Sequence, residues 1–327
     1  MKIFITGATG FVGRHLIRYL ASSAKSRPEI FGSCYPERPD NCIDLCADFP
    51  ALHLIHLDLR SGESTADAIR SVQPDRIVHL AAVSQVRVSW EHRRETLETN
   101  LMGTFNLYEA VRKHTPKTRI LFISSSDVYG RLTPKGRIFR EEDRGCAVSP
   151  YAFSKISGEI LSEFYAASEK LDVVVARPFP HTGPGQSADF VCSDWARQIS
   201  LIEKQPGQRS GKQRSVIQVG NLGIRRDFSD VRDVVRAYLA LLEKGRRGQI
   251  YNISSGRAPS LKAILQTLLA FSQAKIEVHV DPERIRKTDI PYLAGSHRKI
   301  THETGWKPQI ELKTTLGDLL DYWRRRI

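Results

Sequence analysis

Residues 2–13, Lys2-Ile-Phe-Ile-Thr-Gly7-Ala-Thr-Gly10-Phe-Val-Gly13, decide the fold. The β-branched and aromatic run at residues 2–6 predicts a buried strand, and apolar residues at helical spacing follow from Phe11 to Leu20. Glycines between a strand and a helix allow a tight turn, and the helix N-terminus offers free N–H groups to a pyrophosphate. The stretch therefore predicts a dinucleotide-binding turn. Its spacing is GxxGxxG rather than GxGxxG, and a purely structural glycine turn is the alternative.

Strands alternate with helices beyond this turn. Further strands are predicted at residues 29–35, 52–57, 76–80, 119–123 and 173–176, with a long helix over 91–113. This alternation predicts an α/β fold with a doubly wound, mainly parallel Rossmann sheet, in which ligands bind at the carboxyl ends of the strands.

The pattern becomes irregular after residue 176. Helices are predicted at 190–203, 231–243, 261–271 and 312–325, and strands at 216–219 and 249–253. A chain of 327 residues is long enough for two lobes. We predict a Rossmann domain from residues 1–176 with about 225–250, and a smaller C-terminal α/β lobe from 177–224 and 251–327.

The composition, 41% hydrophobic and 26% charged, is typical of a globular protein. The chain has no apolar run of about 18 residues and no secretory signal pattern, so we expect a cytoplasmic protein that does not enter a membrane. The net charge is +13, but the basic residues are spread along the chain. The tight run Arg324–Arg326 ends a predicted helix, where cations suit the dipole, so we expect no nucleic-acid partner. The five cysteines and ten histidines show no ligand spacing, and we expect no metal.

The pentapeptide Tyr151-Ala-Phe-Ser-Lys155 indicates proton chemistry. Pro150 suits a helix start, and residues four apart on a helix lie on one face, so the tyrosine hydroxyl and the ammonium can converge. A free tyrosine has a pKa of about 10. A cation beside the phenol favours the phenolate, which predicts that Lys155 lowers the pKa of Tyr151. A surface Tyr and Lys on an amphipathic helix are the alternative.

Together, the glycine turn, Ser125 in SSSDVYG, Tyr151 and Lys155 resemble the extended short-chain dehydrogenase/reductases that act on nucleotide-sugars. Asn100 in TNLMGTFNLYEA and the stretch 226–230 are also similar to that group. Within it, residues 177–186 (RPFPHTGPGQ) and 282–295 resemble the GDP-4-keto-6-deoxy-D-mannose reductases, which make GDP-D-rhamnose. The GDP-mannose 4,6-dehydratases share the C-terminal pattern.

The resemblance implies catalytic roles. Ser125 would hydrogen-bond the C4 carbonyl oxygen of the sugar, Tyr151 would protonate it, and Lys155 would tune the tyrosine and bind the nicotinamide ribose. Ser124 or Ser126 is the alternative serine if the register shifts by one residue. Asp127 stands where the dehydratases carry a catalytic Glu, but its side chain is one methylene shorter. A solvated acid is its alternative.

The resemblance also implies NADP(H) or NAD(H) as cofactor. Glu37 would favour NAD, whereas Arg38 or Arg14 would favour NADP, and Asp58 would contact adenine unless it only caps a turn. With Tyr151 and Lys155, the predicted cofactor-binding residues are Gly7, Thr9, Gly10, Phe11, Val12, Gly13, Arg38, Asp58, Leu59, Leu80, Ala81 and Ala82.

The substrate side follows from the same resemblance. The predicted substrate-binding residues are Ser84, Ser126, Arg177, His181, Arg226 and Arg286. Among them, Arg226 and Arg286 would bind phosphate, since guanidinium matches phosphate geometry, and a surface arginine is the alternative for each. The family usually has an Asn contacting the substrate diphosphate three residues after the arginine that matches Arg177. Here Pro180 stands there and has no N–H donor. His181, the backbone or a shifted substrate is expected to compensate.

The sequence thus predicts NAD(P)H-dependent reduction of GDP-4-keto-6-deoxy-D-mannose to GDP-D-rhamnose. A 4,6-dehydratase or C4 epimerase that recycles its cofactor is the first alternative, and a non-catalytic NADP-sensing protein is the second. The resemblance also implies a homodimer through a four-helix bundle, built by residues 91–113 and 151–171 of each subunit.

Overall fold

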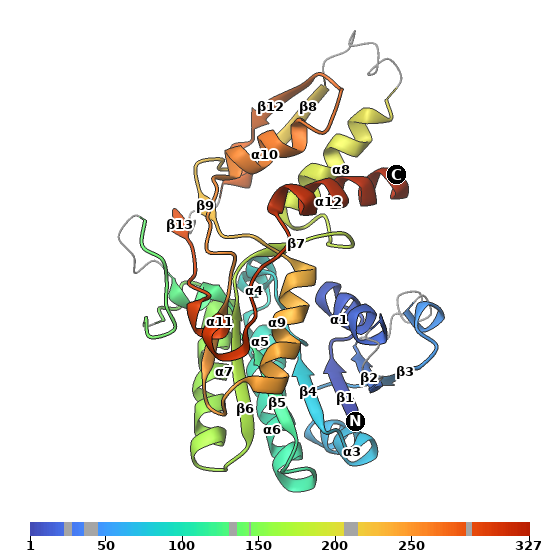
Figure 1. Ribbon diagram of the computed structural model, residues 1–327, viewed down its shortest axis with the longest axis vertical. Coiled ribbons are helices and arrows are strands. Elements are labelled where there is room, and N and C mark those ends of the chain that lie inside the picture. Colours follow the sequence, from blue (N-terminus) through green and yellow to red (C-terminus); the bar gives the residue numbers. More distant parts are fainter. Residues whose placement is uncertain (23–27, 36–44, 131–135, 144, 206–214, 286–289) are drawn as a thin grey trace.

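The computed structural model describes residues 1–22, 28–35, 45–130, 136–143, 145–205, 215–285 and 290–327. A seven-stranded parallel sheet of order β11-β6-β5-β4-β1-β2-β3 forms its larger part (Figure 1). Its strands are β1 (Lys2–Thr6), β2 (Glu29–Cys34), β3 (Leu52–His56), β4 (Arg76–His79), β5 (Arg119–Ile123), β6 (Asp172–Pro178) and β11 (Ile250–Ile253). The predicted Rossmann-type α/β fold is confirmed.

Helices cover both faces of the sheet because successive residues of each buried strand point to opposite sides. Ile3 and Ile5 of β1 belong to the core beneath α1 (Phe11–Ser22) and α9 (Val231–Lys244). Phe4 belongs to the opposite core. That second core is covered by α3 (Gly62–Val72), α6 (Gly103–His114) and α7 (Pro150–Ala167).

The single helix predicted over residues 91–113 is divided. The structure has α4 (Val86–Glu91), α5 (Arg93–Leu97), a π-helical turn η1 (Glu98–Met102) and then α6. The π-turn holds the buried Asn100, whose side chain bonds to a neighbouring loop and to α7. Single π-turns inside helices frequently mark functional sites.

A second, smaller lobe lies at the top of Figure 1 and has its own core, including Trp195 and Leu265. It contains α8 (Val191–Glu203), β8 (Ser215–Val219), α10 (Leu261–Leu269), β12 (Ile276–Val280) and α12 (Leu312–Arg326). Between the lobes, β7 (His181–Thr182) pairs with β10 (Ser229–Asp230), and β9 (Arg225–Arg226) pairs with β13 (Tyr292–Leu293). The short helical elements are η2 (Ser126–Tyr129), η4 (Pro282–Arg284) and α11 (Arg298–Thr304).

The C-terminal segment contributes more to the first core than the predicted boundaries allow. Besides α9, strand β11 completes the large sheet, and Ile300 and Trp306 pack in the core beneath α1 and α9. The chain therefore crosses between lobes several times. Within the described ranges, no helix is both long and apolar enough to cross a membrane.

Candidate active site

The glycine turn after β1 is built for close backbone approach. Gly7 has a φ of +70°, and a Cβ placed there would lie 2.9 Å from Ala81 Cα. A Cβ on Gly13 would lie 2.5 Å from the carbonyl oxygen of Ala8. Gly10 is exposed at the start of α1, where the first N–H groups have no acceptor within the helix. With Thr9, Phe11 and Val12 half-buried beside it, this open turn fits a dinucleotide pyrophosphate.

The loop after β4 forms the next rim of the site. Leu80, Ala81 and Ala82 are half-buried and Ser84 is exposed. Asn100 fixes this loop, because its Oδ1 accepts from Val83 N at 2.8 Å and its Nδ2 donates to Val83 O at 3.1 Å.

Asn100 also ties the loop to helix α7, because its Nδ2 donates to Ser154 Oγ at 3.0 Å. Sequence reasoning used Asn100 only as a family motif. Its positioning role depends on contacts between distant parts of the chain.

Asp58 and its neighbours lie at the carboxyl ends of β2 and β3. Both Asp58 carboxylate oxygens accept from Arg60, and this hydrogen bonding lowers the pKa of Asp58. Arg60 Nη2 also donates to Tyr35 Oη at 2.6 Å. Arg60 is thus a cation, not predicted from the sequence, in the region expected to hold adenosine.

The other residues predicted for the adenosine end differ in placement. Leu59 is buried in the core, where Gly103 leaves room for it. Arg14 donates to the carbonyl oxygen of Thr9 at 3.2 Å. Glu37 and Arg38 lie outside the described residues.

Helix α7 carries the tyrosine and the lysine inward. Ser149 caps its start by accepting from Ala152 N, and Pro150 occupies the first turn. Tyr151 and Lys155 are both buried. A Cβ on Gly158 would lie 2.4 Å from the Phe122 ring, so glycine lets α7 approach β5 closely. Lys155 Nζ consequently reaches the Ile123 carbonyl oxygen at 2.7 Å.

Three consecutive serines follow β5, and only Ser125 joins the tyrosine. The Ser125 side chain lies near enough to Tyr151 to lower the pKa of its phenol, and Ser125 Oγ accepts from Asp127 N at 3.1 Å. Ser124 Oγ instead donates to Glu159 Oε1 at 2.5 Å. Ser126 is buried within η2. The geometry therefore favours Ser125 over both alternatives.

The prediction that Lys155 lowers the pKa of Tyr151 is wrong for this structure. Burial raises the pKa of Tyr151, and the nearby Asp127 carboxylate raises it further, against a lowering by the Ser125 hydrogen bond. The Lys155 ammonium is directed at the Ile123 carbonyl and lies 5.9 Å from the Tyr151 ring centroid. Burial also lowers the pKa of Lys155 to about 8. Tyr151 is thus a protonated phenol that can act as an acid.

Arg177 points into the protein interior rather than into an open site. It is 5% exposed, and its guanidinium donates to both carboxylate oxygens of Glu159 and to Tyr129 Oη. A substrate phosphate would have to displace these buried partners. We therefore assign Arg177 a structural role in place of the predicted substrate contact.

His181 and Arg226, two further predicted substrate residues, lie on β7 and β9 between the lobes. The His181 ring stacks on Phe11 at 7° between planes, and its Nδ1 contacts the Phe179 carbonyl oxygen at 3.0 Å. Pro180 accepts from Ser229 N, so this segment is held by its backbone. Arg226 is half-buried and donates to the carbonyl oxygens of Arg225 and Ile290. Arg286 lies outside the described residues.

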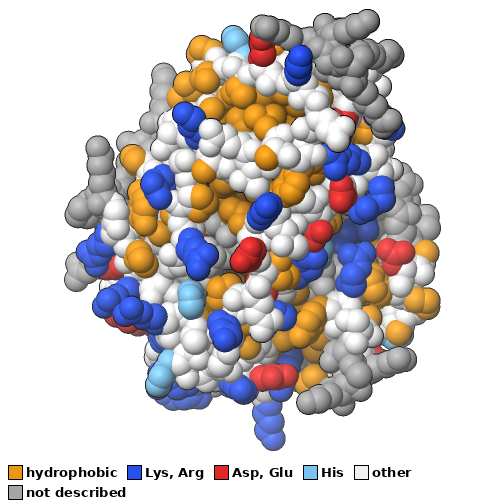
Figure 2. Space-filling model, turned by 45° about the horizontal axis from the view of Figure 1, so that its top comes forward, with side chains coloured by type: hydrophobic (Ala, Val, Ile, Leu, Met, Phe, Trp, Pro, Cys, Tyr) orange, Lys and Arg blue, Asp and Glu red, His pale blue; other side chains and the backbone are white. Residues whose placement is uncertain are grey.

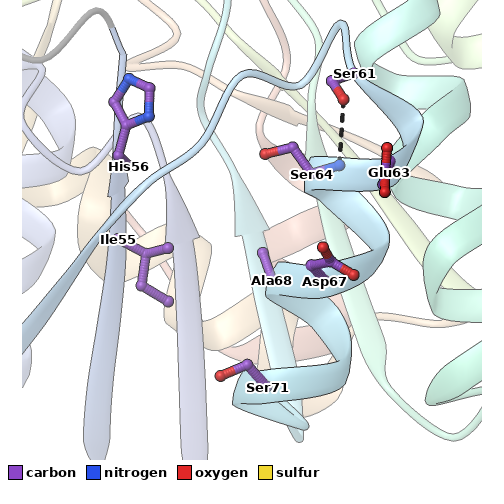
Figure 3. Close-up of a pocket in the computed structure, with 8 residues that line it drawn as sticks. All are labelled: Ile55, His56, Ser61, Glu63, Ser64, Asp67, Ala68 and Ser71. Atoms are coloured by element: carbon purple, nitrogen blue, oxygen red, sulfur yellow. Dashed lines mark hydrogen bonds between the residues drawn. The ribbon is translucent and has the colours of Figure 1, made fainter.

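A hollow of about 500 Å³ lies between β3 and α3. Figure 3 shows Ile55 and His56 of β3 facing Ser61, Ser64 and other residues at the start of and along α3. None of the predicted site residues lines it. Over the face drawn in Figure 2, lysine and arginine side chains are scattered rather than gathered into one stripe.

Comparisons with known proteins agree with the motifs. The family model described as GDP-mannose 4,6 dehydratase matches residues 4–319. The GDP-6-deoxy-D-mannose reductase of Pseudomonas aeruginosa is 34% identical over 326 residues, which cover 100% of this chain and 98% of that protein.

Two solved structures are similar over nearly their whole length. The NADPH complex of RMD from Pseudomonas aeruginosa is 33% identical and has a TM-score of 0.83, with 100% of this chain and 99% of that chain covered. A putative epimerase from Burkholderia cenocepacia is 30% identical and has a TM-score of 0.85, with 99% and 98% covered.

Proposed function

Because the chain belongs to the GDP-mannose 4,6-dehydratase family of extended short-chain dehydrogenase/reductases, we propose that it is an NAD(P)H-dependent oxidoreductase of a GDP-sugar. The reaction is reduction of the C4 keto group of GDP-4-keto-6-deoxy-D-mannose to GDP-D-rhamnose. The observation that carries the proposal is the placement of the Ser125 side chain beside Tyr151, with Lys155 buried one helical turn further along α7. The reductase relative matched over its whole length supports the substrate.

The chain's own groups supply binding and the proton. Ser125 donates a hydrogen bond to the C4 oxygen, and Tyr151 transfers its phenolic proton to that oxygen as negative charge develops there. The phenol of Tyr151 is protonated at neutral pH, so it holds the proton that the C4 oxygen accepts. When bound, the reduced nicotinamide supplies the hydride that the C4 carbon accepts. Lys155 would bind the nicotinamide ribose.

The glycine turn and the α1 N-terminus would hold the cofactor pyrophosphate, and residues 80–82 would line the nicotinamide side of the site. NADPH is the cofactor named for the similar RMD structure, and we propose NADPH here. Arg14 and Arg60 supply positive charge around the adenosine end, while Arg226 with His181 lies on the substrate side.

The test is cofactor consumption with purified protein. Added to GDP-4-keto-6-deoxy-D-mannose, the enzyme should oxidise one NADPH per sugar, and NADH less efficiently. If it consumes no cofactor but converts GDP-mannose to the keto-sugar, it is a dehydratase. If the protein neither oxidises cofactor with the keto-sugar nor converts GDP-mannose, the proposed GDP-sugar substrate is contradicted. A non-catalytic NADP-sensing role is disfavoured because Ser125, Tyr151 and Lys155 are all present.

A variant at Asp127 distinguishes a reductase from a dehydratase. Its carboxylate raises the pKa of Tyr151, so Asp127→Asn removes that effect while keeping the side-chain length. A reductase needs no acid for proton transfer at C5, so we expect Asp127→Asn to retain reduction within about tenfold. A dehydratase that used Asp127 would lose about 10²–10⁴-fold. Rates of keto-sugar reduction and of GDP-mannose dehydration in the same variant distinguish the two.

We also propose that the protein is a cytoplasmic homodimer. Apolar side chains stand exposed on the two segments expected to form a four-helix bundle. Their exposed fractions are 48% for Met102, 39% for Phe105, 50% for Phe153, 63% for Ile160 and 52% for Phe164. Such a gathering of exposed apolar residues is typical of a protein–protein interface.

Charge placed on this surface should separate the subunits. We expect Ile160→Glu to weaken the dimer by about 2 kcal/mol or more, as for a central interface residue. Light scattering over a concentration series measures this shift towards monomer. Val278→Glu is the matched control, since Val278 is 42% exposed on β12 in the other lobe. A dimer unaffected by Ile160→Glu would place the interface elsewhere.

A further inference from the structure

The buried carboxylate of Glu159 has no part in the proposed chemistry, yet it joins the elements that carry it. Glu159 lies one helical turn after Lys155 on α7 and is 8% exposed. Its Oε1 accepts from Ser124 Oγ at 2.5 Å and from Arg177 Nε at 2.8 Å, and its Oε2 accepts from Arg177 Nη2 at 2.7 Å. Helix α7 and the ends of β5 and β6 therefore meet at one carboxylate.

Arg177 extends the connection to two further elements. Its Nη1 donates to Tyr129 Oη of η2 at 3.0 Å and to the Glu141 carbonyl oxygen at 3.1 Å. Tyr129 Oη in turn donates to Asn252 Oδ1 of β11 at 2.7 Å. Desolvating a charged pair offsets much of its attraction, so a buried pair is weak evidence for a purely stabilising role.

We propose that Glu159 and Arg177 form a positioning pair that holds the Ser125 hydroxyl and the Lys155 ammonium in their working places. The pair acts through two short connections. Ser124, anchored on Glu159, directly precedes Ser125, and Glu159 shares a helix face with Lys155. This inference rests on the proposed function of the Ser125, Tyr151 and Lys155 group.

The charges around Lys155 also support a positioning role for Glu159. Burial lowers the pKa of Lys155 to about 8, and the Glu159 carboxylate opposes that lowering. On β4, burial and then Lys155 lower the pKa of His79 to about 3, so His79 is neutral. Two other groups face the lysine directly: Tyr151 on its own helix and the Ile123 carbonyl on β5. Two charged groups lie one step further away. Asp127 of η2 acts on Tyr151, and Arg177 of β6 is paired with Glu159. Glu159 is therefore the carboxylate that favours a charged Lys155.

Glu159→Gln tests the pair because it keeps an acceptor for Ser124 and removes the charge. If activity needs the Lys155 ammonium, the wild type loses kcat/KM as the pH rises through about 8. Without Glu159, the lysine should lose its proton at lower pH, so the alkaline limb moves to lower pH. The pH dependence of the NADPH dissociation constant should shift in the same direction, because Lys155 is proposed to bind the ribose.

Asp172→Asn is the matched control. Asp172 pairs with Arg119 at 2.7 Å across the same two strands, β6 and β5, but at their opposite ends. Its loss should leave both pH profiles unchanged. Ser124→Ala keeps the Glu159 charge and should lower kcat about tenfold or more by loosening Ser125, with the alkaline limb unmoved.

The outcomes are distinct. An unshifted alkaline limb in folded Glu159→Gln, or wild-type kcat in Ser124→Ala, would overturn the proposal. If Glu159→Gln does not fold, Ser124→Ala decides alone. A wild-type protein that turns over no keto-sugar contradicts the proposed function instead, and the NADPH-binding profiles of the variants still test the positioning pair.

Discussion

Tyr151→Phe is expected to lower kcat for keto-sugar reduction by about 10²–10⁴-fold, the usual worth of a positioned general acid. The change removes one oxygen, and with it the proton that the account assigns to the C4 oxygen. The ring keeps its packing on α7, so NADPH affinity should stay within about threefold of the wild type. Stopped-flow absorbance measures turnover, and fluorescence titration measures cofactor binding.

Tyr165→Phe is the control for this prediction. Tyr165 lies on the same helix and is also buried, but its hydroxyl donates to Glu109 at 2.8 Å, away from the serines that follow β5. Its loss should change stability without changing kcat. Turnover of Tyr151→Phe at the rate of Tyr165→Phe would remove Tyr151 from the mechanism.

Gly13→Val is expected to weaken NADPH binding strongly. A Cβ at this position lies 2.5 Å from the Ala8 carbonyl and 2.7 Å from the Gly7 carbonyl, so the turn backbone has to move. Overpacking typically costs about 1–3 kcal/mol. If the turn must regain its native shape to bind NADPH, this cost is subtracted from the binding free energy. At about 1.4 kcal/mol per tenfold, NADPH affinity then falls about 5- to 150-fold.

Gly317→Ala controls for adding a side chain to a helical glycine. A Cβ there meets only the Phe271 ring at an ordinary 3.6 Å, and alanine is about 1 kcal/mol more favourable than glycine inside a helix. NADPH affinity should stay unchanged and the melting temperature should rise or hold. Unchanged cofactor affinity in Gly13→Val would contradict the assignment of the turn.

Local patterns predicted the elements nearest the chemistry well. The strand, turn and helix of residues 2–22 depend on neighbours in the chain, as does the one-turn spacing of Tyr151 and Lys155. The prediction of one continuous helix over 91–113 was wrong. A π-turn interrupts it at Asn100, whose side chain bonds to a loop and to α7, and these contacts are distant in the sequence. Strand β12 was missed because most of it is exposed, so it carries no burial pattern.

The site errors have a different cause. Sequence spacing places Arg177 at a strand end but does not say on which side its guanidinium lies, and a buried Glu159 holds it inward. Likewise, spacing brings a cation near Tyr151, whereas the pKa depends on burial and on Asp127. Glu159 itself occupies an ordinary helix position, so its role is visible only once three elements meet around it.

The most direct test of the account is isotopic. The enzyme is given GDP-4-keto-6-deoxy-D-mannose and NADPH that carries deuterium at both hydrogen positions of the nicotinamide C4, and the product is analysed by NMR. We expect one deuterium at sugar C4 and one oxidised cofactor per product. Product without deuterium at C4, or with cofactor left reduced, would show that the Ser125, Tyr151 and Lys155 group does not carry out this reduction.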